Sequence, residues 1–512
     1  MSSPSNPNTQ AALGNIPYDP QTPTTEAIPH DPQTPTIEAI SQYVNTVCQQ
    51  IRWKKARPRI TEELSAHLED TRDAYESQGH SQAAATAQAI ADAGDATQIG
   101  TQLDRVHRPK PQWAMLGAAA ALVALGLAVY AFFAGGLSFE RLLFTGFGAA
   151  GLLAAYFLDF TWLVKYPMTL FTGVAMAAFV RLLMRYRFIY IPFLTPARAS
   201  TAFDPAMTGI TFFSMGDTIT LVFPLALATV IFYARGRGYW GVIFSALSFT
   251  LLQMFAFVMS VGSAARFTVI GLMLFGVAIF KGSFNVKRIY ASLLAFGPTM
   301  LLGVLVLTTA ALNDFQRQLL WVRFAAVFNP SAQPYTYGFW SMMTRTILRD
   351  AAWFGQGSTE GLSMLFGFAL SPPMRVQGIS ALTAVIGLTG WVSFVVIVSA
   401  LAFFMAQGMM RCLRQKSNLG LVVSTAVMLT FAVQTVEYVL FNLGFQMASP
   451  IALPLIVSCN ATLIINMTLV GFMLSVFRSG DAVMDKHYSV DARKWVSWED
   501  GRLIIDFKPT SG

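Results

Sequence analysis

The chain carries little charge. Of its 512 residues, only 12% are Asp, Glu, Lys or Arg, about half the share that is usual in soluble globular proteins. By contrast, 54% are hydrophobic, and 41 are Phe. A water-soluble domain cannot bury so much apolar surface, so the composition excludes an ordinary soluble protein. It predicts a membrane protein that crosses the bilayer several times.

Cysteine and histidine are also scarce. The three cysteines, Cys48, Cys412 and Cys459, form no CxxC pair, so we expect neither a disulfide framework nor a zinc site. All five histidines lie outside the apolar segments, which leaves no histidine-based metal or haem site within the membrane. The net charge is +8. In a membrane protein, such an excess of Lys and Arg usually marks the cytoplasmic loops, so we expect no nucleic-acid partner.

Several catalytic motifs are missing from the sequence. It contains no P-loop, no GxGxxG after a strand, no GxSxG and no DxD-type nucleotide-sugar signature. These absences disfavour an enzyme that uses soluble nucleotides and an ATP-driven pump.

The N-terminal part is polar and has two sections. Residues 1–36 are rich in Pro, Ser and Thr and contain a near-duplication, so they are predicted to be disordered. Residues 37–110 are predicted to form a soluble helical bundle, with Ser81 and Asp95 as helix N-caps. A dense polar group within it is interpreted as a solvated helix face: Glu62, Glu63, His67, Glu69 and Asp70.

From residue 113 to residue 478 the composition is that of a membrane domain. Ten apolar stretches are long enough to cross a bilayer, which takes about 20 residues each. The short loops alternate between basic and nearly neutral, which predicts that both termini are cytoplasmic. The predicted stretches are 113–134, 141–163, 167–184, 217–234, 239–260, 264–281, 289–312, 379–407, 418–443 and 452–477.

Two long connections are predicted on the outer side, at 185–216 and 313–378. Long loops in compact domains are often functional, and the second is rich in aromatic residues. The tail at 479–512 is predicted to be cytoplasmic, with a small hairpin around an Asp-Gly turn.

Acid–base chemistry in the membrane domain must draw on few carboxylates. Glu437 stands out because it lies within an apolar stretch, where a charge is costly and is a functional candidate by default. Pairing with an arginine is the alternative interpretation for this residue. The eight carboxylates are Glu140, Asp159, Asp204, Asp217, Asp314, Asp350, Glu360 and Glu437.

A series of short motifs follows in order along the membrane domain. Residues 323–330 read RFAAVFNP, and residues 355–358 read GQGS. Later, NLG at 442–444 precedes LPLIVS at 453–458. In this order, and with ten predicted spans, the motifs resemble the SEDS family (shape, elongation, division and sporulation proteins, FtsW/RodA/SpoVE).

This resemblance covers about residues 113–478. It implies an all-α polytopic membrane protein with about ten transmembrane helices and a large outer loop between the seventh and the eighth. Residues 37–108 are similar to a permease prefix domain, a helical module that precedes some membrane domains.

The sequence departs from the family at the positions that carry its chemistry. Aligned on Gly390, the family's catalytic Asp falls on Ile379, and its Glu-Glu pair falls on Gly387 and Leu388. The element before the fourth helix keeps an acid, Asp217, but loses its lysine.

Membership of the family implies polymerisation of lipid II at the outer face. A carboxylate base deprotonates a sugar hydroxyl, which attacks an anomeric carbon and displaces a lipid pyrophosphate. Because Ile379 cannot accept a proton, Asp350 and Glu360 are the candidate catalytic residues. No resident cofactor is expected, and a divalent metal is implied only if the protein is catalytic. The candidate substrate-binding residues are Arg323, Asp217, Asn442 and Ser458, and Arg345, Arg349 and Arg375 are further candidates for pyrophosphate.

Three functions remain open. The favoured one is a non-catalytic member that acts in cell-wall peptidoglycan assembly, cell shape or division in a bacterial plasma membrane. The second is an active glycosyltransferase with a displaced carboxylate, and the third is a lipid or solute transporter. The implied partners are membrane lipids, lipid II or another polyprenyl-linked substrate, and a penicillin-binding protein transpeptidase or other division or elongation proteins.

Overall fold

The computed structural model of the protein is described for most of the chain. The chain divides into two compact units, residues 1–110 with 482–484 and residues 111–481 with 485–512, and each is treated by itself. The described residues are 36–54, 56–107, 112–158, 160, 166–194, 218–312, 314–335, 338–357, 380–415, 417–446, 450–457, 460–479, 496–499 and 502–505. Within them, no side chain is described at 36–37, 107, 184–194, 302, 306–312, 314–317, 319–320, 323, 496–499 or 502–505. The predicted disordered segment lies outside the described residues, apart from Thr36.

The N-terminal unit contains four described helices around one apolar core. Apolar residues at helical spacing on the first helix, such as Val44 and Val47, pack with Leu64 and Leu68 of the second. The helices are α2 (Thr36–Gln50), α3 (Arg57–Ser77), α4 (Gln82–Ala93) and α5 (Ala96–His107). Burial raises the pKa of Tyr43 to about 12, so its phenol stays protonated and donates to the Gly94 carbonyl at 2.9 Å.

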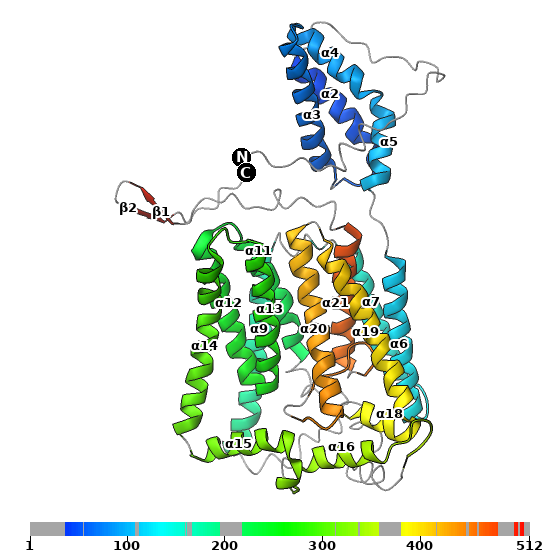
Figure 1. The fold of residues 1–512 in the computed structure, drawn as a ribbon, viewed down its shortest axis with the longest axis vertical. Coiled ribbons are helices and arrows are strands. Elements are labelled where there is room, and N and C mark those ends of the chain that lie inside the picture. Colours follow the sequence, from blue (N-terminus) through cyan, green and yellow to red (C-terminus); the bar gives the residue numbers. More distant parts are fainter. Residues whose placement is uncertain are drawn as a thin grey trace. The chain divides into compact units, whose positions relative to one another are not determined.

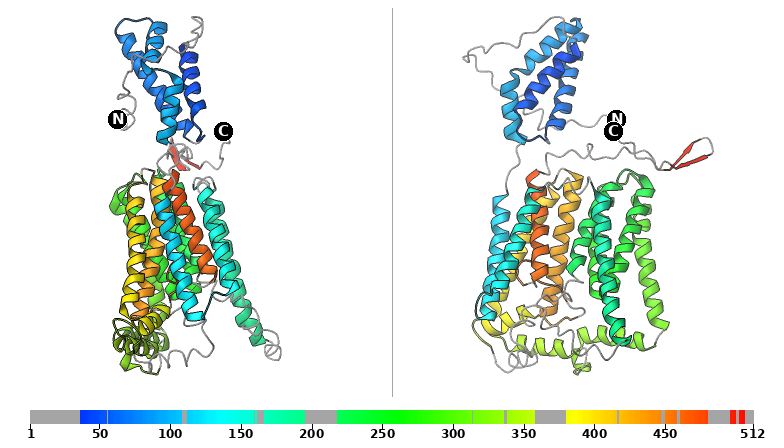
Figure 2. Two further views of the ribbon diagram at one scale, coloured as in Figure 1. Left: turned by 90° about the vertical axis from the view of Figure 1, so that its right-hand side faces the viewer. Right: turned by 180° about the vertical axis from the view of Figure 1, so that it is seen from behind.

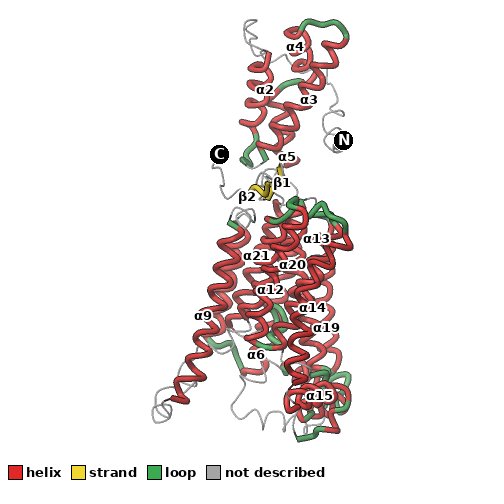
Figure 3. The backbone as a smooth tube through the Cα atoms, turned by 90° about the vertical axis from the view of Figure 1, so that its left-hand side faces the viewer, coloured by secondary structure: helices red, strands yellow, loops and turns green. Residues whose placement is uncertain are grey.

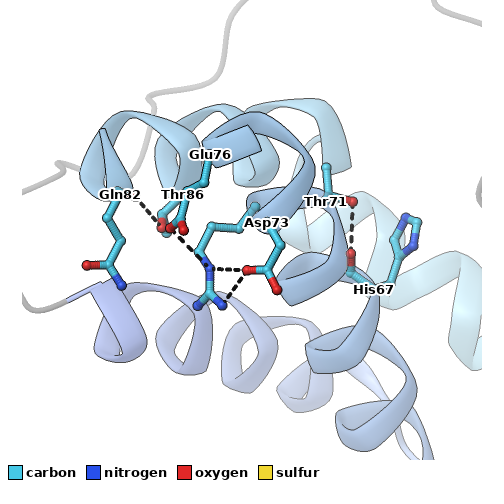
Figure 4. Close-up of polar contacts among 7 residues, drawn as sticks. His67, Thr71, Asp73, Glu76, Gln82 and Thr86 are labelled. Atoms are coloured by element: carbon cyan, nitrogen blue, oxygen red, sulfur yellow. Dashed lines mark hydrogen bonds and ion pairs between the residues drawn. The ribbon is translucent and has the colours of Figure 1, made fainter. Parts of the chain in front are cut away.

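Caps and ion pairs organise the surface of this unit. The Asp95 carboxylate accepts from the Gln98 amide at 2.9 Å and caps α5, whereas Ser81 is the N-cap residue of α4 without a side-chain capping bond. Figure 4 shows the α3–α4 region, where Arg72 bonds Asp73 at 2.7 Å and pairs with Glu76 at 3.6 Å. His67 is exposed, and the hydrogen bond drawn to it ends on its backbone carbonyl.

The second unit is a bundle of apolar helices (Figures 1 and 2). Among the described residues, seven helices are long and apolar enough to cross a membrane: α6, α12, α13, α14, α19, α20 and α21. The helix α7, which starts with a Glu-Arg pair, and the shorter apolar helices 167–183 and 220–233 complete the set. The all-α, multi-pass membrane fold predicted from composition is therefore confirmed.

Most of the predicted spans match single helices (Figure 3). The long helices within the ten predicted spans are α6 (Trp113–Ala134), α7 (Phe139–Phe157), α9 (Pro167–Leu194), α11 (Phe223–Tyr233) preceded by η2 (Thr220–Val222), α12 (Gly238–Met259), α13 (Val261–Phe280), α14 (Arg288–Leu312), α19 (Trp391–Leu413), α20 (Asn418–Asn442) and α21 (Asn460–Ser479). The tail forms the predicted hairpin, in which β1 (Val496–Glu499) pairs antiparallel with β2 (Arg502–Ile505).

Three predicted boundaries were wrong. The eighth stretch is two helices, α18 (Ala381–Thr389) and α19, because Gly390 takes φ +94° between them. The tenth stretch does not begin as a helix: residues 453–457 form a turn in which Leu455 has φ +64°, and helix α21 runs from Asn460. The third helix continues past residue 184 to Leu194, into the segment that was predicted as a long connection.

Helices α11 and α20 form the centre of the bundle. Every residue from Phe223 to Phe232 is buried, and α11 packs against α9, α12, α13 and α20. The central α20 also contacts α13, α18, α19 and α21. Helices that are apolar all round and central in this way suit the interior of a membrane bundle.

Close packing of α7 against α21 depends on small residues. A methyl group on Gly471 would lie 2.3 Å from the Leu152 carbonyl oxygen, and one on Gly148 would lie 2.5 Å from the Met467 sulfur. Small residues let helix backbones approach closely, which provides van der Waals packing where lipid removes the hydrophobic driving force.

The predicted large loop contains two helices that cross one end of the bundle. These are α15 (Asp314–Phe328) and α16 (Phe339–Arg349), joined by η3 (Pro330–Ala332). Figures 1 and 2 show both of them running across the ends of the long helices. We call this end, which also carries α18, the loop end. The opposite end, which carries Arg235, Arg237, Arg411 and Arg478, is called the arginine end.

Candidate functional site

Only part of the predicted site lies within the described residues. Asp217, Glu360 and Ser458 fall outside them, as does Ile379. Arg323 lies in α15, but its side chain is not described. The structure therefore locates the side chains of Asp350 and Asn442, and it places both at the loop end.

The first three residues of the GQGS motif, 355–357, belong to a segment that is hydrogen-bonded to the break between α18 and α19. The Gly355 amide donates to the Thr389 carbonyl at 3.2 Å, and the Gly357 amide donates to the Gly387 carbonyl at 3.0 Å. In return, the Trp391 amide donates to the Ala352 carbonyl at 3.1 Å. These backbone bonds fix residues 350–357 against the start of α19.

Gly390 permits this close approach. A methyl group there would lie 2.5 Å from the Trp353 carbonyl oxygen, and the backbone has φ +94°. We expect Gly390→Ala to lower the free energy of unfolding by about 2–4 kcal/mol, because positive-φ strain and overpacking add. The control is Gly135→Ala, which has φ +70° but open space around it, and which should cost about 1–2 kcal/mol.

These two losses can be measured by denaturant titration in mild detergent. Hydrogen exchange at the Gly355 and Gly357 amides should rise in Gly390→Ala and stay unchanged in Gly135→Ala. Equal losses in the two variants would show that the close approach to Trp353 contributes nothing.

Asp350 follows the last residue of α16 and is exposed. Its backbone amide donates to the Thr346 carbonyl at 3.1 Å. Within the described part of the chain, its carboxylate has no hydrogen-bond or ion-pair partner. An exposed carboxylate on a loop that is fixed in place can accept a proton from an approaching hydroxyl group, which is the role that the sequence predicts for it.

Asn442 is fully buried and joins α20 to α18. Its side-chain oxygen accepts from the Thr383 amide and from the Thr383 hydroxyl, both at 3.0 Å, and its amide donates to the Tyr438 carbonyl at 2.9 Å. Thr383 is the third residue of α18, so Asn442 satisfies one of the amides that a helix start leaves unpaired. These contacts link the two helices, and substrate binding by Asn442 stays a prediction.

Arg345, one of the predicted pyrophosphate ligands, bonds backbone carbonyls instead. Its guanidinium donates to the Val327 carbonyl at 2.7 Å, the Gly444 carbonyl at 3.2 Å and the Phe328 carbonyl at 3.4 Å, and it lies over the Phe445 ring. Carbonyls at the C-termini of α15 and α20 carry partial negative charge, which favours a cation there. Arg345 therefore ties α15, α16 and the end of α20 together.

We expect Arg345→Met to lower the free energy of unfolding by about 2 kcal/mol, because charged hydrogen bonds of this kind are worth about 1.5–3 kcal/mol. Arg349→Met is the matched control on the same helix, and since Arg349 is exposed it should cost less than about 1 kcal/mol. Hydrogen exchange in α15 should rise only in the Arg345 variant. If both variants behaved alike, the tie through Arg345 would be refuted.

The intramembrane carboxylate Glu437 pairs with Arg266 of α13. Arg266 is only 5% exposed as a residue, and its guanidinium also donates to the Ser263 hydroxyl at 3.1 Å. The pair joins α13 to α20 near the loop end. The alternative interpretation of Glu437, that it pairs with an arginine, is thus confirmed.

The structure also contains a second polar cluster, which the sequence did not predict. Asn460, at the start of α21, donates to the Glu140 carboxylate at 2.7 Å and accepts from the Arg141 guanidinium at 3.3 Å. Arg141 is buried and lies over the Tyr130 ring, 5.2 Å from its centroid. Because 319 residues separate Arg141 from Asn460, sequence spacing offers no signal for this contact.

The carboxylates that the structure describes do not gather into a metal site. Among the described residues, no three His, Cys, Asp or Glu side chains lie together in a way that could hold an ion. At the loop end, the described carboxylates Glu140, Asp350 and Glu437 instead occupy three separate places: beside Asn460, exposed after α16, and paired with Arg266.

These features define the chain as a polytopic all-α membrane protein with a structured loop folded over one end of its bundle. Five solved chains match this fold. One belongs to a structure described as "Structural coordination of polymerization and crosslinking by a peptidoglycan synthase complex". It has a TM-score of 0.52 and 16% sequence identity, and the match covers 72% of this chain and 98% of that chain. At this identity the likeness concerns the fold.

No protein-family model matches the chain, and a search of curated proteins finds no match.

Proposed function

We propose that the protein is a divergent SEDS-type membrane protein of bacterial cell-wall assembly. The observation that carries the proposal is the fold likeness to a chain of a peptidoglycan synthase complex, which covers nearly the whole of that chain. The order of motifs in the sequence supports it. Two of them, GQGS at 355–358 and NLG at 442–444, include residues that hold the loop end together.

We infer the orientation from the arginine end. Arg235 lies over the Phe232 ring at 3.8 Å, Arg237 over Tyr233 at 4.1 Å, and Arg478 over Tyr156 at 4.7 Å. An excess of Lys and Arg in short loops marks the cytoplasmic side. On this basis both chain termini are cytoplasmic, and the loop end faces outward, where a polyprenyl-linked substrate would be used.

We further propose that the protein is not a polymerase of the family's usual kind. The position of the family's catalytic Asp is taken by Ile379, which has no proton acceptor. Glu437, the carboxylate inside the membrane region, is engaged by Arg266. A protein with this fold and without the base would hold a partner enzyme, such as a penicillin-binding protein transpeptidase, or a lipid-linked substrate.

An active enzyme is the second candidate, and one observation favours it. The Asp350 carboxylate is exposed at the loop end and bonds no other described side chain. With substrate bound at the loop end, Asp350 would serve as the base, with Glu360 as the other sequence candidate and a divalent metal to offset pyrophosphate charge.

The polymerisation assay distinguishes the two candidates. Purified protein is incubated with fluorescent lipid II and a divalent metal, with and without penicillin-binding proteins whose own transferase sites are disabled. We expect no glycan ladder, while an active SEDS protein run in parallel gives one. A ladder would establish the second candidate, and its loss in Asp350→Asn or Glu360→Gln would then identify the base.

A further inference from the structure

The N-terminal unit has a basic end. Residues 52–59 read RWKKARPR and contain five basic residues and no acid, and residues 105–110 read RVHRPK and contain three. The turn after α2 lies beside the last turn of α5, because the Arg52 amide donates to the Asp104 carboxylate at 2.8 Å. We call the described basic residues of this end the basic cluster: Arg52, Lys54, Arg57, Arg59 and Arg105.

The basic cluster is accessible to a partner. Three of its side chains are exposed and the other two are half-buried. The carboxylates at the same end are Glu62 and Glu63 in the second turn of α3 and Asp104 in α5. Glu63 pairs with Arg59 at 2.9 Å. Since the cations outnumber these carboxylates, the end keeps a net positive charge.

The opposite end of the same unit is acidic. Helix α3 has 21 residues, which is about 30 Å of helix, and the acids lie in its C-terminal half. Tyr75 donates to the Asp92 carboxylate of α4 at 2.5 Å, which adds a further acid to this end. The exposed carboxylates are Glu69, Asp70, Asp73, Glu76 and Asp92. Because charge of opposite sign is separated along the unit, an anionic surface attracts its basic end and repels its acidic end.

A short tether keeps the basic end near the membrane. Residues 108–112 connect the end of α5 at His107 to the start of the first membrane helix, α6, at Trp113. An extended chain spans at most about 3.6 Å per residue, which limits this connection to about 20 Å. Trp113 is 73% exposed, and tryptophan at the end of a membrane helix is typical of the membrane–water interface. The end of α5 therefore stays within about 20 Å of the membrane surface.

We propose that the basic cluster binds the anionic phospholipid headgroups of the cytoplasmic leaflet. The inference rests on the orientation proposed above, in which the N-terminal unit is cytoplasmic. That leaflet has a negative surface potential, and each Lys or Arg near it strengthens binding about fivefold. The potential extends about 8 Å into physiological salt, a distance that the tether allows the basic cluster to reach. The unit thus docks on the membrane through its basic end, with its acidic end toward the cytoplasm.

Energy transfer to the lipid surface tests this docking in the full chain. Cys48, Cys412 and Cys459 are changed to Ala, and a donor dye is attached at Gln102→Cys, beside the basic cluster, or at Gln78→Cys, at the acidic end. Both positions are exposed. The acceptor dye is carried by lipid headgroups in nanodiscs of phosphatidylcholine, with or without phosphatidylglycerol.

We expect stronger transfer from the Gln102 label than from the Gln78 label when phosphatidylglycerol is present. The difference should disappear in phosphatidylcholine alone, and also in about 1 M salt, where the Debye length falls to about 3 Å. The triple variant Arg52→Gln, Lys54→Gln and Arg105→Gln should weaken docking about a hundredfold, because three cations are lost.

The matched control removes three exposed cations from the membrane unit instead. It is Lys281→Gln with Lys287→Gln and Arg288→Gln, and it should leave the transfer unchanged. If this control and the triple variant had equal effects, the basic cluster would have no specific role and the proposal would be overturned.

Two further results would also overturn the proposal. They are equal transfer from the two labels in anionic nanodiscs, and transfer that is independent of lipid charge and salt. Both comparisons use a chain with the basic cluster intact, so they decide the question even if the triple variant fails to fold. The assay contains no partner enzyme and no lipid II, so a negative result leaves the proposed role in cell-wall assembly untouched.

Discussion

Replacing Arg266 by Leu should lower the free energy of unfolding by about 3–5 kcal/mol, because the Glu437 carboxylate loses its cationic partner inside the bundle. The same loss is expected for Glu437→Leu, which leaves the almost fully buried guanidinium without its anion. A lone charge in the membrane region is costly, so either single change also favours local rearrangement of α13 and α20.

The double variant separates pairing from burial. Arg266→Leu with Glu437→Leu removes both charges and should recover most of the lost stability, since apolar replacement of a buried ion pair is often neutral. Lys287→Leu, which removes an exposed cation elsewhere in the bundle, should change stability by less than about 0.5 kcal/mol. Denaturant titration in mild detergent measures all four variants.

Strictly additive losses in the double variant would contradict this account. They would mean that Arg266 and Glu437 stabilise the protein independently and that the ion pair contributes no coupling.

Replacing Asn442 by Leu should lower the free energy of unfolding by about 2–3 kcal/mol. The change leaves the Thr383 amide buried at the start of α18 without its acceptor, and an unsatisfied buried donor costs about 1–3 kcal/mol. The Asn442 side chain on α20 caps the start of α18, so its loss should also destabilise α18.

Thr383→Val is the matched control for Asn442. It removes the hydroxyl but keeps the Thr383 amide, which still donates to Asn442, so it should cost only about 1 kcal/mol. Hydrogen exchange in α18 should rise strongly in Asn442→Leu and weakly in Thr383→Val. An Asn442 variant as stable as the wild type would refute the capping role.

Hydropathy predicted the membrane fold well because the signal is spread over long stretches. Each span is an average over about 20 residues, so the number and order of helices do not depend on any single contact. Helix boundaries were predicted wrongly where a single backbone position ends or delays a helix. These positions are Gly390 and Leu455, which have positive φ values. The Asp-Gly turn in the tail was a local signal, and its hairpin formed as predicted.

The candidate site could be predicted only in part. Sequence reasoning singled out Glu437 because a carboxylate in an apolar stretch is costly, but its partner Arg266 is 171 residues away. Arg345 was interpreted as a pyrophosphate ligand, yet it donates to backbone carbonyls. A residue pattern cannot predict such contacts, because every residue has a backbone carbonyl. Asn442 was singled out by a motif, and its partner Thr383 became visible only when α18 and α20 were in place.

The most direct test of the central claim is complex formation with a penicillin-binding protein. The protein is co-expressed with each transpeptidase-type penicillin-binding protein of its source, extracted in mild detergent, and analysed by light scattering for mass and composition. A SEDS protein with its own transpeptidase serves as the positive control under the same conditions. We predict a stable one-to-one complex with at least one transpeptidase and no glycan ladder from that complex when the transpeptidase's own transferase site is disabled. If the control complex forms and none forms with this protein, a role in cell-wall assembly through such a partner would be contradicted.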